Sequence, residues 1–407
     1  MMLLSKVVFL LIITDYYRLI STYTSLSNNI VAVGLLISVM FLIVKKIDGG
    51  YRSIFFKKQV FVILCTFLLV PLIINTVSIA TFDASIDRLI SWTIKTIWFV
   101  CFIFFAYLYK DELFSKGQWT IPILLLMLVI SFILNSVSPE IFVRIGTTYG
   151  VTLSYATYGD IGSRFMGFYL HPNSAAFTLV LILFSIQLYD RQKILYLLPI
   201  LLMVVLTGSR TALVICIFFS FFYFQNEFIQ SKYKFNKNKI VNNFIFLLIS
   251  TFLILILMFL GLTFADSSLI DRLLNLENIG NDESVMIRTI AQSQYLTLLT
   301  NNPVLGYGFD YIRDSIETGR LIKSSHNMYL ERIVQYGILG ILSFLIFLYY
   351  FFKGLRNSLS HWYIIPLLFL YGMFINTFDL ILAFYFFLGA VLYRFERIDN
   401  ENISHNR

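Results

Sequence analysis

His326 stands in a polar segment, residues 324–331, that leads directly into a long apolar run containing Gly337. Histidine is the usual general base near neutral pH, because it takes up and releases a proton there. In the same segment Glu331 could orient such a base or balance Arg332, and Gly337 would let another helix approach closely. The alternative is that His326 only forms hydrogen bonds where polar and apolar residues meet. We predict a catalytic base at His326, supported by Asn327, Tyr329, Glu331 and Gly337.

Two arginines have the chemistry to bind a phosphorylated substrate. Arg210 lies in Thr-Gly-Ser-Arg-Thr, residues 207–211, between two apolar runs, and Arg288 falls on an expected helix. The planar guanidinium group forms paired hydrogen bonds with phosphate and pyrophosphate. An arginine at membrane depth is costly and is a functional candidate by default. The simpler alternatives are that Arg210 reaches for lipid headgroups and that Arg288 is a solvated helix charge. Ser209 is included as a supporting residue.

A weaker cluster comes earlier in the sequence. His171, Pro172 and Asn173 stand at the start of an apolar run, and Arg164 lies a few residues before them. Proline fits the first turn of a helix or a break between segments, so Pro172 marks one of these here. We include His171, Asn173 and Arg164 as supporting residues.

Several motifs that would indicate other chemistry are missing from the sequence. There is no Asp-x-Asp, no Walker loop, no Gly-x-Gly-x-x-Gly, no Cys-x-x-Cys and no Gly-x-Ser-x-Gly. A metal-bound nucleotide-sugar donor is therefore not expected, and we predict that no cofactor and no metal ion is used. The three cysteines lie inside apolar runs and have neither a disulfide framework nor a zinc spacing.

The elements that must position these residues are membrane-spanning helices. The chain has 407 residues, of which 58% are hydrophobic and 13% charged, whereas soluble proteins carry about 25% charged residues. A spanning helix needs about 20 mostly apolar residues. We predict an all-α, polytopic membrane protein in one transmembrane domain, residues 1–407, with about twelve spans near 3–22, 29–45, 59–80, 89–109, 119–138, 167–188, 194–207, 211–225, 242–264, 330–352, 361–377 and 379–393.

Lysine-rich loops indicate how these spans are oriented. Such loops fall near residues 45–58, 110–116, 191–193, 232–239 and 353–356, and the C-terminal segment carries Arg394 and Arg397. They alternate as twelve spans with both termini in the cytoplasm require, because cytoplasmic loops collect lysine and arginine. The net charge of +8 is therefore explained by membrane topology, and nucleic acid is not an expected partner. The basic residues left on the outer face are mostly arginines, some of which could pair with outer carboxylates.

The longest hydrophilic stretch, about residues 266–325, falls outside the cytoplasm by the same alternation. It contains an expected helix near 284–300 with Ile287, Ile290, Ala291, Tyr295 and Leu298 on one apolar face. Asn302 and Pro303 would end this helix, and Gly306 and Gly308 would allow a tight turn. An external loop of this length is more often functional than idle.

These motifs together resemble the O-antigen polymerase and O-antigen ligase family of bacterial membrane glycosyltransferases. The resemblance rests on TGSRTALV (207–214), against the family's Arg-x-x-x-Leu with valine in the last position, and on His326 followed by ten residues and Gly337. It also rests on the stretch from Arg288 to NNPVLGYGF (301–309) and on GFYLHPN (167–173). They span about 150 residues in family order. The resemblance implies a metal-independent, GT-C-like helical transferase.

The resemblance further implies that a glycan is transferred from undecaprenyl pyrophosphate to an acceptor hydroxyl on the outer face of the bacterial inner membrane. Arg210 and Arg288 would stabilise the departing pyrophosphate, and His326 would act as the base. Polymerisation of lipid-linked repeat units is the preferred reaction, with ligation to lipid A core or another acceptor as the alternative. The expected partners are the undecaprenyl-pyrophosphate-linked oligosaccharide and membrane lipid, and a chain-length regulator and a flippase are further candidates. A transporter or flippase and a non-catalytic scaffold are the other classes considered, but a transporter of two equal halves would carry its long loop inside.

Overall fold

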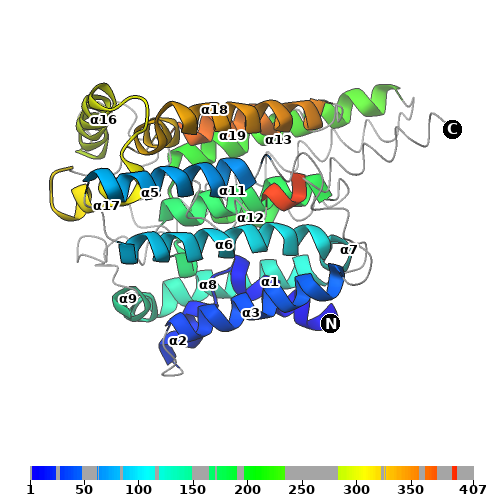
Figure 1. Ribbon diagram of the computed structural model, residues 1–407. Coiled ribbons are helices and arrows are strands. Elements are labelled where there is room, and N and C mark those ends of the chain that lie inside the picture. The colour runs from blue at the N-terminus through cyan, green and yellow to red at the C-terminus, as the bar shows by residue number, and fades with distance from the viewer. Residues whose placement is uncertain are drawn as a thin grey trace. The chain divides into compact units, whose positions relative to one another are not determined.

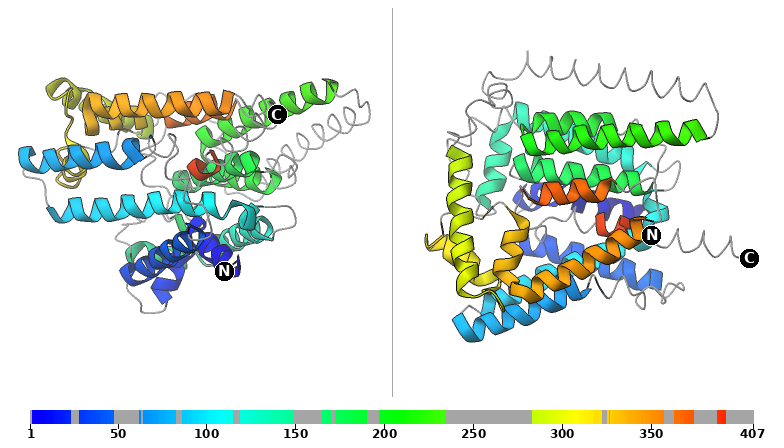
Figure 2. Two further views of the ribbon diagram at one scale, coloured as in Figure 1. Left: turned by 45° about the vertical axis from the view of Figure 1, so that its right-hand side comes forward. Right: turned by 90° about the horizontal axis from the view of Figure 1, so that it is seen from above.

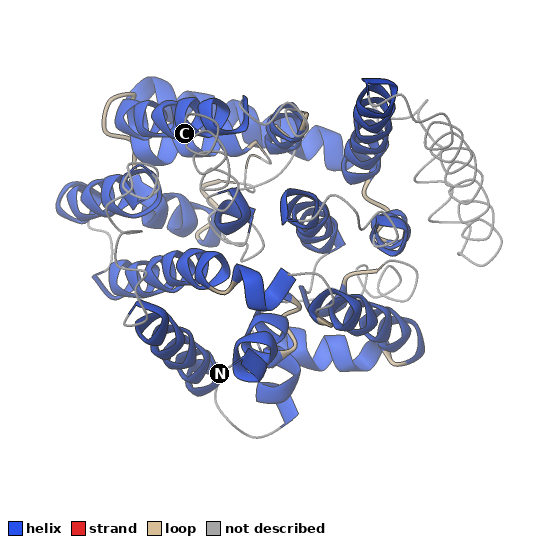
Figure 3. Cartoon of the chain, turned by 90° about the vertical axis from the view of Figure 1, so that its right-hand side faces the viewer, coloured by secondary structure: helices blue, strands red, loops and turns tan. Residues whose placement is uncertain are grey.

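The computed structural model describes residues 2–23, 28–47, 62, 64–82, 86–114, 119–148, 165–169, 172–189, 197–233, 283–321, 325, 327–356, 363–373 and 387–391. Within this part of the chain every regular element is a helix (Figure 3), which confirms the all-α class. The chain divides into two compact units: residues 1–38 with 109–276, and residues 39–108 with 277–407. Each is described by itself.

Unit 1 is built around one helix that is buried on every side. This helix, α11, runs from Pro172 to Tyr189 and contacts α12 (Leu197–Leu206) and α13 (Arg210–Tyr233). Its residues 175–188 are all buried, as expected for a helix that is hydrophobic all round. The other elements of unit 1 are α1 (Met2–Ile13), α2 (Tyr17–Tyr23), the start of α3 (Asn28–Lys46), α7 (Lys110–Phe114), α8 (Thr120–Val137), α9 (Pro139–Thr148) and the 3-10 turn η4 (Gly167–Tyr169).

The first expected span, residues 3–22, is interrupted. Helix α1 ends at Ile13, and the chain turns at Asp15, which has a φ of 56°, before α2 begins at Tyr17. Left-handed backbone is uncommon for residues other than glycine, although aspartate tolerates it better than most. The apolar run predicted one helix, because a single backbone break leaves no mark in hydrophobicity alone.

Unit 2 contains most of the long hydrophilic stretch, from residue 277 on, together with helices from before and after it in the chain. Its elements are the π-helical turn η3 (Cys65–Leu69), α5 (Val70–Phe82), α6 (Ile86–Leu108), α16 (Glu283–Asn301), α17 (Gly308–Glu317), α18 (Met328–Arg356) and α19 (Ile364–Gly372). Helix α5 lies against both α6 and α18, and α17 contacts α5 and α18 (Figure 1).

Helix α16 confirms the helix expected near 284–300. It runs across the end of α18 rather than along it (Figure 2). Its Tyr295 packs in a buried cluster with Tyr307 of the following turn, Leu321 and Val334 of α18. The expected apolar face is largely correct, because Ala291 and Tyr295 are fully buried; Ile290, however, is 40% exposed and lies off that face.

The helices have features of a membrane protein. Among the described residues one helical segment, Met328–Tyr350, is long and apolar enough to cross a membrane. Shorter apolar helices are Met2–Ile13, Cys65–Thr81, Trp92–Leu108, Thr120–Asn135, Pro172–Leu188 and Arg210–Tyr223. Helix α8 exposes an aliphatic stripe at Leu126, Ile130, Ile133 and Val137. Large exposed apolar surfaces of this kind indicate contact with lipid or protein.

Candidate functional site

Helix α18 begins with a side-chain cap next to His326. The Asn327 Oδ1 atom accepts hydrogen bonds from the backbone amides of Tyr329 (3.1 Å) and Leu330 (3.2 Å). Asparagine is a favoured residue at this position, because its oxygen satisfies amides that have no partner inside the helix. His326 itself lies outside the described residues. The residues that precede and follow it, Ser325 and Asn327, are both described.

Ser325 fixes the other side of this segment. Its hydroxyl oxygen accepts the backbone amide of Asn327 (3.1 Å) and lies within donating distance of the Asn327 carbonyl (3.0 Å) and of Glu331 Oε1 (3.3 Å). Glu331 is buried. The sequence left open whether Glu331 orients a base or balances Arg332; the structure gives it a contact with the hydroxyl next to residue 326.

Helix α16 is hydrogen-bonded to this same segment. Gln292 Nε2 donates to the Ser325 carbonyl at 3.3 Å. One turn earlier on α16 stands Arg288, which is half-buried. Burial raises the pKa of Tyr295, and the negative charge of Glu331 raises it further. A contact with the backbone of Ser325 lowers this pKa by a smaller amount. The hydroxyl of Tyr295 is therefore held neutral close to Glu331. Gln292 was not singled out from the sequence, because its partner Ser325 lies 33 residues away along the chain. Tyr295 was expected only as part of the apolar face of this helix.

Arg332 belongs to the fold of unit 2. Its guanidinium carbon lies 4.8 Å from the ring centre of Phe67, 5.4 Å from that of Tyr336 and 5.6 Å from that of Phe344. Stacking of arginine on aromatic faces is favourable, more so when water is excluded. Arg332 is only 3% exposed. The sequence offered Arg332 as a charge that Glu331 could balance; in the structure its guanidinium group stacks on aromatic rings.

Three glycines join the loop to a break in α18. Gly337 has φ 57° and ψ −155°, and the helix is kinked there. The break leaves the Val334 carbonyl to accept the Tyr307 amide (3.0 Å), and the Ile338 amide to donate to the Val304 carbonyl (3.1 Å). A Cβ atom on Gly337 would collide with the Val304 carbonyl oxygen.

The turn on the loop side also depends on glycine. Gly306 and Gly308 have φ values of 69° and 76°, which confirms the tight turn expected there. A Cβ atom on Gly306 would lie 2.6 Å from the Gln335 carbonyl oxygen. Gly337, predicted to let a helix approach, instead lets this loop approach α18. We call the contact between residues 304–308 and 334–338 the glycine junction.

In unit 1 Arg210 is the first residue of α13. Gly208 has a φ of 64°, and Ser209 caps the helix: its Oγ accepts the Ala212 amide at 3.5 Å and its carbonyl accepts the Leu213 amide at 3.0 Å. Ser209 is buried, whereas Arg210 is partly exposed. Backbone amides and the helix dipole make a helix N-terminus favourable for anions. A guanidinium group there adds a full positive charge.

The GFYLHPN stretch lies beside the same end of unit 1. Two residues before this stretch, the Phe165 amide donates to the carbonyl of Leu206, the last residue of α12, at 2.7 Å. Pro172 and Asn173 are the first two residues of α11, a position at which proline is common. Arg164 and His171 lie outside the described residues.

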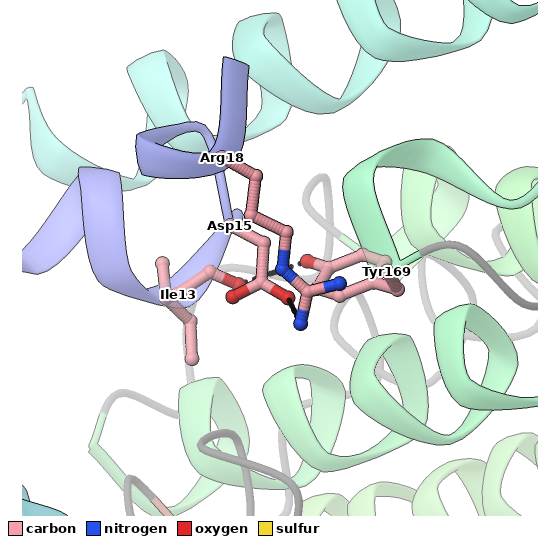
Figure 4. Close-up of polar contacts among 4 residues, drawn as sticks. All are labelled: Ile13, Asp15, Arg18 and Tyr169. Carbon is pink, nitrogen blue, oxygen red and sulfur yellow. Dashed lines mark hydrogen bonds and ion pairs between the residues drawn. The ribbon is translucent and has the colours of Figure 1, made fainter. Parts of the chain in front are cut away.

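Figure 4 shows a polar cluster that was not predicted as a unit. Arg18 Nη2 lies 3.1 Å from Asp15 Oδ2, and the Tyr169 hydroxyl donates to the Ile13 carbonyl at 2.8 Å. The helix end at Ile13 and the turn at Asp15 are thereby held by Tyr169 of the GFYLHPN stretch. The sequence allowed for the pairing of some arginines with carboxylates, and Arg18 pairs in this way with Asp15.

The described residues contain no group of three or more His, Cys, Asp or Glu side chains that could hold a metal ion. Residues 195–345 match the family model described as O-antigen ligase. This stretch includes Arg210, Arg288, His326 and the glycine junction, and it confirms the resemblance seen in the sequence. No curated protein and no solved structure matches the chain.

Proposed function

Since residues 195–345 match the family model described as O-antigen ligase, we propose that the chain is a member of the O-antigen polymerase and ligase family. It transfers glycans from undecaprenyl pyrophosphate on the extracytoplasmic face of the inner membrane. The acceptor is a sugar hydroxyl, and the product is a lengthened surface polysaccharide such as O-antigen or capsule. Membership of the family implies a glycan-transferring activity; the donor and the side of the membrane are part of the proposal.

One observation carries the assignment of the site within unit 2. The hydrogen bond from Gln292 to the Ser325 carbonyl ties α16, one turn from Arg288, to the residue immediately before His326. The Asn327 cap and the Ser325–Glu331 contact fix the same segment from the other side. Arg288 and His326 thus belong to two segments that are hydrogen-bonded to each other. This favours a shared role for the cation and the base in one reaction.

The proposed step moves one glycosyl group. His326 takes the proton of the acceptor hydroxyl, whose oxygen bonds to the anomeric carbon of the donor sugar. The bond from that carbon to the pyrophosphate oxygen breaks, and undecaprenyl pyrophosphate leaves with the electron pair. Arg288 stabilises the negative charge on the leaving group, which is the role that the family resemblance also gives to Arg210. Neither a metal ion nor a cofactor is needed to balance this step.

Polymerisation is the preferred reaction, with the growing chain transferred to a new lipid-linked repeat unit. Ligation to lipid A core or another acceptor is the second candidate, because the matching family model is described as O-antigen ligase. A transporter is a third class. A purified protein given only lipid-linked repeat units separates them: a polymerase yields a ladder of lengthened glycans, a ligase needs the second acceptor, and a transporter yields no new bond.

The same assay tests the base. His326→Ala should lose most of the single-turnover rate, because general acid–base groups contribute about 10²–10⁴-fold, while binding of the lipid-linked donor persists. The rate should also fall as pH is lowered through about 6.5, where histidine ordinarily takes up a proton. Arg320→Ala is a matched control, since Arg320 is exposed and stacks on Tyr311. A near-normal rate for His326→Ala would contradict the assignment of the base, and loss of wild-type activity in EDTA would reveal a required metal.

A further inference from the structure

The turn between α16 and α17 exposes three consecutive apolar residues, Pro303, Val304 and Leu305. Val304 is 58% exposed and Leu305 is 44% exposed. Single exposed apolar residues are common on protein surfaces. Here they form one tip, held in a fixed backbone shape by the glycine junction, and no charged residue stands among them. We call residues 303–305 the apolar tip.

The apolar tip is fixed at the point where the exposed stripe of α18 begins. Before the kink at Gly337, residues 328–336 of α18 are buried or half-buried. After it, the exposed apolar side chains follow one helix face: Ile338, Leu342, Leu345, Ile346 and Tyr349. The Ile338 amide donates to the Val304 carbonyl at 3.1 Å. The apolar tip therefore continues this stripe.

The length of α18 after the kink matches a membrane. The sequence marks the expected cytoplasmic end of this span with Lys353 and Arg356. They lie 15 and 18 residues after Ile338. At 1.5 Å per residue these separations are about 23 and 27 Å, close to the hydrocarbon thickness of about 30 Å. The kink, and with it the apolar tip, falls near the opposite membrane surface.

The exposed face of α16 next to the apolar tip can also contact lipid. Its exposed apolar residues are Met286, Ile290 and Leu296. The hydroxyls between them are satisfied inside the helix: Ser293 donates to the Ile290 carbonyl (2.7 Å) and Thr297 to the Ser293 carbonyl (3.1 Å). Because a polar group buried in lipid without a partner is costly, such internal bonds let a helix face the membrane interface.

We propose that the apolar tip inserts into the lipid leaflet on the side of the long loop and anchors α16 at headgroup depth. Lipid is the occupant because the tip continues a stripe of α18 that itself needs an apolar solvent. In combination with the proposed function, this anchor would keep Arg288 at the depth where the phosphates of lipid-linked substrates lie.

The test measures lipid contact at one residue. Val304→Cys carries an environment-sensitive NBD label on the full-length chain, in a background with Cys65, Cys101 and Cys216 replaced, reconstituted in phosphatidylcholine–phosphatidylglycerol vesicles. Ile338→Cys on the α18 stripe is the lipid-facing reference. Thr318→Cys, in the exposed turn after α17, is the matched water-facing control. Each site is titrated with lipids that carry a quencher near the headgroup and, separately, with aqueous iodide.

The expected result is a loss of emission at residue 304 with the lipid-borne quencher, comparable to residue 338, and protection from iodide. Residue 318 should show the opposite. Emission at 304 that iodide quenches as strongly as at 318 would overturn the proposal, because the tip would then face water. Protection from both quenchers would also overturn it, because a second copy or another protein would then cover the tip. The readout does not depend on transfer activity and so is separate from the proposed function.

Discussion

At the scale of single residues, the arginines of this chain have different surroundings. Arg18 pairs with Asp15, and Arg332 is enclosed by three aromatic rings. Both hold the fold together. Arg210 instead starts a helix, and Arg288 is half-buried one turn from Gln292. Residue type alone could not separate these roles, since the surroundings of Arg332 include Phe67, which is distant in sequence.

Lysine should replace these two arginines poorly. A lysine keeps the positive charge at Arg210 or Arg288 but cannot form the paired hydrogen bonds that a guanidinium group makes with pyrophosphate. Loss of one charge-assisted hydrogen bond, about 1.5–3 kcal/mol, corresponds to roughly a ten- to hundredfold slower transfer. The single-turnover rate of Arg210→Lys and Arg288→Lys checks this, with Arg320→Lys as control. Wild-type rates in both lysine variants would show that diffuse positive charge is sufficient.

Gln292 is expected to act as a positioning residue. Gln292→Ala removes the hydrogen bond to the Ser325 carbonyl, which contributes about 0.5–1.5 kcal/mol, and loosens the segment around residue 326. We expect a lower kcat with an unchanged KM for the lipid-linked donor.

Gln294→Ala is the matched control for this variant, because residue 294 points about 200° away from residue 292 on the same helix. Equal losses in the two variants, or a parallel fall in thermal stability without a change in kcat, would contradict a positioning role for Gln292.

Several elements could be predicted from the sequence. The loop helix, its end before Pro303 and the glycine turn all have local causes, namely apolar periodicity, a helix-ending proline and glycines at positive φ. The break at Asp15 and the kink at Gly337 could not be predicted. The first is held by Tyr169 from a remote stretch, and the second by backbone hydrogen bonds from Tyr307 and to Val304.

The glycine junction should be sensitive to a single methyl group. Gly337 has a backbone conformation that is essentially restricted to glycine, and a Cβ atom would also collide with Val304. We expect Gly337→Ala to lower the free energy of unfolding by about 3 kcal/mol or more and to abolish transfer.

Gly319→Ala separates strain from collision in this experiment. Gly319 has a φ of 75°, but nothing lies within 4 Å of the position of its Cβ atom. The Gly319→Ala substitution should lower the free energy of unfolding by only about 1–2 kcal/mol and leave transfer largely intact. Thermal unfolding of the detergent-purified variants measures both. Equal effects at the two positions would show that the junction does not depend on close contact.

At the scale of the whole molecule, composition predicted the class but not the detailed arrangement. The low charge and long apolar runs indicated a helical membrane protein, and exposed aliphatic stripes on α8 and α18 agree with this. The number of spans stays a prediction: the run at 242–264 lies outside the described residues, and the run at 3–22 is broken at Asp15. The family match extends over parts of both units, as did the motifs that the sequence singled out.

The orientation of the chain in the membrane is the last prediction. Alternation of lysine-rich loops places residues 266–325 outside and residues 232–239 inside. In a background without the three native cysteines, Asn281→Cys should react with a membrane-impermeant maleimide in cells whose inner membrane is intact. Asn236→Cys should react only after that membrane is permeabilised. The reverse pattern would place His326 and Arg288 in the cytoplasm, where transfer between lipid-linked glycans at the outer face is impossible, and the proposed reaction would have to be abandoned.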